Sequence, residues 1–144
     1  MIEQDTIKLL RECDAGIKMG VSAINEVLEY VSSDKLRSFL KESLEEHYDI
    51  KKDLETLLDK YHDDGKEPAA IAKGMSWMKT NFKLSFNESD SIIADLILDG
   101  CNMGIKSLCR YLNQYKAADE ESKEFTKKLV QLEEKLGYEM RNYL

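Results

Sequence analysis

Residues 5–31 read DTIKLLRECDAGIKMGVSAINEVLEYV, and this stretch decides the fold class. Along it, apolar side chains recur at spacings that alternate between three and four residues. The stripe consists of Ile7, Leu10, Asp14, Ile17, Val21, Ile24, Leu28 and Val31, in which only Asp14 is charged. Such spacing places side chains on one face of a helix that packs in a bundle. It predicts a helix over about residues 6–31 with Asp5 as its N-cap.

The same alternation recurs in three later segments and predicts helices near 34–62, 90–115 and 120–143. The connections Ser32-Ser33-Asp34 and Ala117-Ala118-Asp119 are short. The first two helices and the last two should therefore form antiparallel hairpins. The sequence predicts an all-α fold, a four-helix bundle.

A motif shared by the first and third helices indicates an internal duplication. Gly16-x-x-Met19-Gly20 superposes on Gly100-x-x-Met103-Gly104 at an offset of 84 residues. Glycine costs up to about 1 kcal/mol inside a helix, so its placement needs a reason. We expect close helix–helix approach near mid-bundle, with a flexible hinge as the alternative.

The connection between the hairpins, residues 63–89, is too long for a tight turn. Helical spacing of Ile71, Met75, Met78 and Phe82 predicts a short helix near 69–83 within it. Its length allows the chain to travel along the bundle, which is the one-crossover connection of ferritin-like bundles. We therefore expect a single domain over 1–144, with a hairpin at 5–62, a crossover at 63–89 and a hairpin at 90–144.

Several short motifs, spread over nearly the whole chain, resemble those of a known protein family. They are Gly65-Lys66-Glu67-Pro68, Trp77-Met78-Lys79, Ile93-Ala94-Asp95-Leu96 and Asp99-Gly100. With them the chain resembles a family of bacterial ferritin-like four-helix proteins whose function is not established. The resemblance implies a ferritin-like fold and brings no activity with it.

Composition limits the partners that this chain can have. Its net charge of −7 argues against a nucleic-acid or anionic-membrane surface, because both reward basic patches. The longest stretch without a charged residue is Met19 to Asn25, too short for a membrane span. The N-terminus lacks the features of a signal peptide.

The chain has three cysteines, Cys13, Cys101 and Cys109, which form no C-x-x-C pair and are expected to be core residues. A cytoplasmic location is therefore predicted.

A di-iron site of the ferritin-like kind is not expected. Such a site takes a Glu from each of two helices and a Glu-x-x-His from each of the other two. Leu44 precedes His47 by three positions and Asp59 precedes His62, so neither histidine belongs to that motif. We predict no catalytic residue, no cofactor-binding residue and no cofactor.

Two interpretations of His47 are open. As a core histidine it would bond Ser43 or a nearby carbonyl. As a mononuclear metal ligand it would need Asp14, Glu46 or Cys101 nearby. We expect Asp14 and Glu139 to be half-exposed near the bundle ends. Asp95 and Asp99, four residues apart, are expected to form a solvated helical face.

These observations favour a non-catalytic protein with a structural or interaction role, either as a homodimer or with a protein partner. The alternative is a metal-binding protein or oxidoreductase with an atypical site around His47. A weaker alternative is a spore-coat-like protein, because some coat proteins look similar in their Gly-x-x-Met-Gly segments.

The cluster Met75, Trp77 and Met78 is expected to form a lid over an apolar groove of the bundle, with a contact to a partner as the alternative. If the cluster forms the lid, Trp77→Ala should lower the free energy of unfolding by about 3 kcal/mol, the bottom of the range for a core tryptophan. For the interface, the variant should keep its stability and change its association state. Urea midpoints and sedimentation of both proteins separate these outcomes, and a variant unchanged in both would contradict each reading.

Overall fold

The computed structural model describes residues 2–67 and 89–144, and within them every regular element is helical. The elements are α1 (Ile2–Leu28), α2 (Asp34–Lys60), α4 (Ser89–Gln114), α5 (Glu120–Met140) and a 3₁₀ turn, η2 (Arg141–Tyr143). The all-α prediction is confirmed for this part of the chain. The predicted short helix near 69–83 lies outside the described residues.

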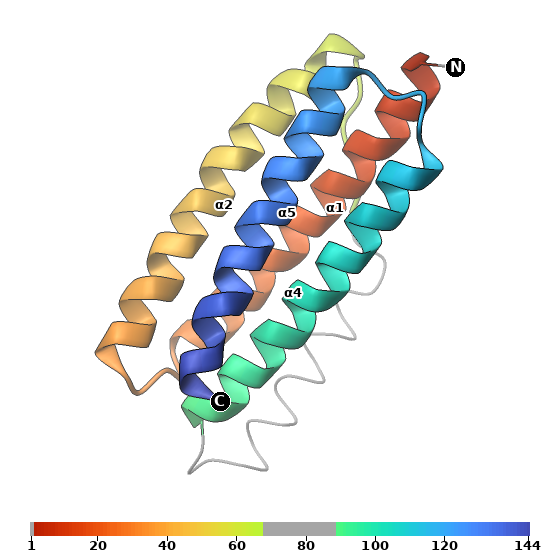
Figure 1. The fold of residues 1–144 in the computed structure, drawn as a ribbon. Helices are drawn as coiled ribbons and strands as arrows, with labels where there is room; N and C mark the ends of the chain where they lie inside the picture. Colours follow the sequence, from red (N-terminus) through yellow and green to blue (C-terminus); the bar gives the residue numbers. More distant parts are fainter. Residues whose placement is uncertain (1, 68–88) are drawn as a thin grey trace.

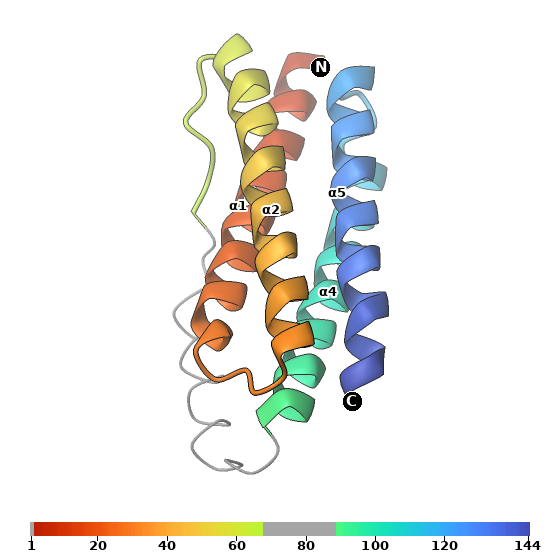
Figure 2. The same cartoon turned by 90° about the vertical axis from the view of Figure 1, so that its left-hand side faces the viewer.

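Two antiparallel hairpins lie side by side, α1 with α2 and α4 with α5 (Figures 1 and 2). Contacts at the two ends fix how they are oriented. The backbone of Ser33, at the start of α2, donates to Asp90 at the start of α4. Tyr61, just after α2, donates to Asp119 in the α4–α5 connection. The helices α2 and α4 therefore run in the same direction.

Helix α1 begins earlier than the sequence predicts. It starts at Ile2 and ends at Leu28, so Asp5 lies inside the helix and does not cap it. The Asp5 carboxylate instead accepts a hydrogen bond from the backbone N–H of Ala117, 3.0 Å away in the α4–α5 connection. A tertiary contact thus uses the carboxylate that local preference assigns to a cap.

The starts of α2 and α5 follow local preference. Ser33 caps α2 by accepting from the N–H of Leu36, and Asp119 caps α5 by accepting from the N–H of Ser122. Side-chain oxygens at this position satisfy one of the free N–H groups of the first turn, worth typically about 1 kcal/mol. Both boundaries agree with the prediction.

The core consists of two apolar clusters at different heights of the bundle. One lies toward the α1–α2 turn and includes Ile24, Leu40, Ile97 and Met140. The other lies toward the opposite end and includes Leu10, Leu54, Leu108, Phe125 and Leu129. Between them, each helix brings a glycine or a polar residue to mid-height: Gly20, His47, Gly104 and Glu133.

None of the described helices combines the length and the hydrophobicity that a membrane span requires.

Asp14 is buried, not half-exposed as the sequence predicts, with 2% of its surface accessible. The residues that follow α2 run back beside α1 (Figure 2), and they cover the side chain of Asp14. Asp14 accepts from the backbone N–H of Lys66 at 2.9 Å and pairs with Lys18 at 2.8 Å. Gly65 has φ of +87°, and an added Cβ would stand 2.2 Å from an Asp14 oxygen. Glu139 is half-buried as expected.

Further ion pairs hold this returning segment on α1. Arg11 donates to Asp63 through two nitrogens, and Lys66 Nζ lies 2.6 Å from Glu12. The hydrogen bond from Arg11 lowers the pKa of Asp63 below its ordinary value. Lys18 also reaches Glu67 at 2.8 Å. The first residues of the connection between the hairpins are therefore fixed against α1.

Among the four glycines of the repeated motif, the expectation of close packing holds for Gly20 alone. A Cβ on Gly20 would lie 2.9 Å from Nε2 of His47. Gly16 and Gly100 are exposed, and an added Cβ would meet nothing within 4 Å. At Gly104 the nearest atom would be an oxygen of Glu133 at 3.9 Å, which is ordinary contact. What excludes a side chain at Gly20 is the buried imidazole, not a neighbouring backbone.

This difference predicts opposite effects of one substitution at matched positions. Gly16→Ala and Gly100→Ala should each stabilise the protein by up to about 1 kcal/mol, because alanine favours helix and has room. Gly20→Ala should be destabilising, since the His47 ring must move. Gly104→Ala is the mid-bundle control and should be tolerated. Urea denaturation of the four variants tests this, and a Gly20→Ala variant as stable as Gly16→Ala would contradict it.

Candidate functional site

The mid-bundle polar layer is centred on His47 of α2, which is fully buried. Its Nδ1 lies 2.7 Å from the carbonyl oxygen of Ser43, one turn earlier in the same helix. Its Nε2 lies 3.1 Å from a carboxylate oxygen of Glu133 on α5. Both ring nitrogens are therefore engaged, in the way expected of a satisfied core histidine.

Glu133 is the second member of the layer and its link with solvent. Its side chain is 12% exposed, whereas that of His47 is 0% exposed. It lines a groove of about 370 Å³ between α4 and α5, together with Leu98, Ile105, Gly137 and other residues. The carboxylate thus reaches from the buried imidazole to the lining of a surface groove.

Two opposing effects set the charge of His47. Burial lowers its pKa and is the largest single effect, because an imidazolium loses its hydration there. The hydrogen bond and negative charge of Glu133, helped by the Ser43 carbonyl and by Glu46, outweigh it. The net result is a pKa above the ordinary value of 6.5, so the folded protein favours the protonated ring.

Cys101 of α4 completes the layer on a third helix. It is buried, and burial raises the pKa of its thiol strongly, with a further rise from the nearby charge of Glu133. A thiol in that state is a poor nucleophile, because the thiolate is the reactive form. Cys13 is likewise buried, with a pKa of about 12 that burial raises. Cys109 is exposed, so the prediction that all three cysteines are core residues is wrong for it.

The two other metal-ligand candidates lie away from the imidazole nitrogens. Asp14 is bonded to Lys18 and to the backbone of Lys66. Glu46 pairs with Lys135 at 3.1 Å on the surface between α2 and α5. Across residues 2–67 and 89–144, no three His, Cys, Asp or Glu side chains are grouped so that they could hold a metal ion.

Ser43 bonds His47 through its carbonyl and not through its hydroxyl. Among the described residues its Oγ has no hydrogen-bond partner, although the residue is 2% exposed. The sequence left both the hydroxyl and a carbonyl open as partners, and the structure selects the carbonyl.

Sequence reasoning did not single out Glu133. The apolar residues of α5 at helical spacing are Phe125, Leu129, Leu132 and Leu136, and Glu133 is not one of them. The residues that are buried also include Ser122, Thr126, Glu133 and Met140. A glutamate at three-four spacing from Leu129 and Leu136 was the signal that could have found it.

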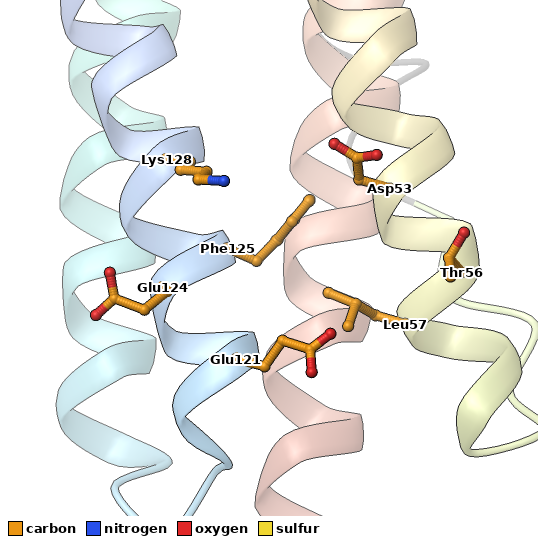
Figure 3. Close-up of a pocket in the computed structure, with 7 residues that line it drawn as sticks. All are labelled: Asp53, Thr56, Leu57, Glu121, Glu124, Phe125 and Lys128. Atoms are coloured by element: carbon orange, nitrogen blue, oxygen red, sulfur yellow. The ribbon is translucent and has the colours of Figure 1, made fainter.

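A second groove, of about 340 Å³, lies between α2 and α5 nearer the other end of the bundle (Figure 3). Phe125 extends from α5 toward α2 on its floor, with Leu57 opposite. Its rim carries Asp53, Glu121, Glu124 and Lys128. These are solvated charges around an apolar floor, and they converge on no common point in the groove.

The remaining sequence-level candidates are placed simply. Asp95 and Asp99 are both exposed, as expected of a solvated helical face. Met75, Trp77 and Met78 lie outside the described residues, so the interface prediction stays a prediction.

Neither the family models nor the curated proteins nor the solved structures compared with this chain gave a match.

The raised pKa of His47 predicts how stability depends on pH. A histidine that binds its proton more tightly when folded stabilises the protein fully below the unfolded pKa of about 6.5. That contribution is lost as pH rises through the higher folded pKa. Urea midpoints of the wild type should therefore fall over this range relative to those of His47→Gln.

A direct readout supports the same test. The chain has two histidines, so His62→Asn leaves His47 as its one imidazole. Its NMR titration should give a pKa above 6.5 that Glu133→Gln lowers. A His47 that titrates below 6.5 would contradict the assigned charge state.

Proposed function

We propose that this chain is a non-catalytic, ferritin-like four-helix protein with a structural or interaction role. The observation that carries the proposal is the mid-bundle layer, where a di-iron protein of this kind would hold its metals. In this layer both ring nitrogens of His47 already have hydrogen-bond partners. The carboxylate of Glu133, which bonds one of them, bonds no second histidine.

The donor set agrees with that reading. A di-iron centre needs about six carboxylate and imidazole ligands from four helices. In this layer α1 contributes Gly20 and α4 contributes Gly104 and Cys101, so neither adds a carboxylate. A metal would also have to displace the imidazole from Glu133 or from the Ser43 carbonyl.

A homodimer or a protein partner belongs to the same proposal. Two apolar side chains support it, Met103 of α4 at 69% exposure and Tyr138 of α5 at 64%. Met and Tyr are enriched at protein interfaces. The segment with Met75, Trp77 and Met78 is the other proposed contact. A bacterial origin and a cytoplasmic location rest on the resemblance and on the cysteine count.

The alternative function is a metal-binding protein or oxidoreductase with an atypical site around His47. One observation favours it: the His47 imidazole and the Glu133 carboxylate come from two helices to one buried layer. A spore-coat-like role is a weaker alternative. Its support is the exposure of Met19 and Met103 at equivalent positions of the two Gly-x-x-Met-Gly segments.

Metal analysis of protein purified without chelators or an affinity tag separates the first two. We expect no stoichiometric iron, manganese or zinc, and unchanged results for His47→Ala. One tightly held metal per chain that disappears in His47→Ala would overturn the proposal in favour of the alternative. Sedimentation of the same samples, with Met103→Ser and Tyr138→Ser beside the wild type, tests whether α4 and α5 form the contact.

A further inference from the structure

The two hairpins are equivalent in their local details, beginning with the caps of their second helices. Ser33 and Asp119 differ by 86 positions, and each accepts from the N–H three residues later. The accepting groups are a serine hydroxyl and an aspartate carboxylate. The same capping bond made by different residues indicates that α2 and α5 correspond at an offset of 86.

The contacts between the hairpins at their ends obey the same correspondence. The N–H of Ser33 donates to Asp90 at 3.0 Å, and the N–H of Asp119 donates to Thr6 at 2.8 Å. Thr6 and Asp90 differ by 84, the offset that relates the glycine motifs of α1 and α4. Each hairpin therefore bonds the first helix of the other in an equivalent way, as an approximate twofold axis requires.

The mid-bundle layer lies on this axis. His47 and Glu133 differ by 86, so they occupy equivalent positions of α2 and α5. Gly20 and Gly104 differ by 84, and an added Cβ on each would face that pair. The bond of 3.1 Å between His47 and Glu133 thus joins two equivalent positions across the axis.

That placement has a consequence for which hairpins can associate. If the first hairpin met a second copy of itself, His47 would face His47, and two copies of the second hairpin would oppose Glu133 to Glu133. We propose that His47 and Glu133 form a pairing code, which makes the inner face of each hairpin complementary to the other hairpin and not to a copy of itself. Unlike charges are satisfied in the buried layer only in the unlike pairing.

Few other titratable groups face the pair from the described helices. Glu46 of α2 acts on the charge of His47, and Cys101 of α4 lies near Glu133. From α1 the nearest residue is Gly20, which has no side chain. The charge balance of the layer therefore depends on positions 47 and 133.

Charge reversal in the full chain tests the code. Glu133→His places two imidazoles in the layer and His47→Glu places two carboxylates there. Like charges repel when ionised, so Glu133→His should be least stable at about pH 5 and His47→Glu at about pH 8. The reciprocal double variant, H47E with E133H, should regain most of the thermal midpoint lost by either single variant.

The expected result is rescue by the double variant together with opposite pH dependences of the two single variants. A double variant no more stable than the weaker single variant would show that the two positions are not interchangeable and would overturn the proposal. If both single variants fail to fold, the double variant still decides, because it either regains the helical circular dichroism of the wild type or does not.

A surface pair supplies the matched control. Lys60 and Glu121 also join α2 to α5, at 3.0 Å, but they are exposed and their positions differ by 61. Reversing Lys60 and Glu121, singly and together, should leave the midpoints nearly unchanged, because exposed ion pairs contribute little. Changes there as large as those at 47 and 133 would overturn the assignment of the code to the central pair.

Discussion

The bond between His47 Nε2 and Glu133 Oε1 is the constraint around which the bundle is arranged. It joins the two hairpins at mid-height, between two apolar clusters that would otherwise meet. A buried charged pair adds little net stability relative to apolar packing, but removing one partner costs about 3–5 kcal/mol, because the other stays buried and unpaired. The pair thus penalises every arrangement of the helices that separates it. Gly20 leaves room for it, since a Cβ at this position would lie 2.9 Å from the ring and would force it to move.

Periodicity predicted the helices well and their tertiary roles less well. The four segments, the short turns and the caps at Ser33 and Asp119 follow from spacing and from local hydrogen bonding, which depend on neighbours in sequence. The roles of Asp5 and Asp14 differ from those that the sequence predicts, because their partners, Ala117 and Lys66, are distant in sequence. A carboxylate that looks like a cap or a solvated end carries no local sign of such a partner.

The candidate site shows the same division. His47 was recognisable as a polar residue on an apolar stripe, and its carbonyl partner lies one turn away. Glu133 belongs to a helix rich in charged residues, where a buried glutamate looks like its exposed neighbours until the rotation of α5 is known. That rotation is set by packing against α4, α1 and α2. Gly16 and Gly20 were alike in sequence, but one faces solvent and the other an imidazole.

Three of the polar contacts between the hairpins lie at different heights: Ser33 with Asp90 at one end, His47 with Glu133 in the middle, and Asp119 with Thr6 at the other. If polar contacts joined the hairpins at one end only, the hairpins could separate at the other end. Here separation at either end leaves the other two contacts intact, and complete separation must break all three. Partial opening therefore exposes apolar core without releasing the chain, which favours unfolding of the described bundle as one cooperative unit.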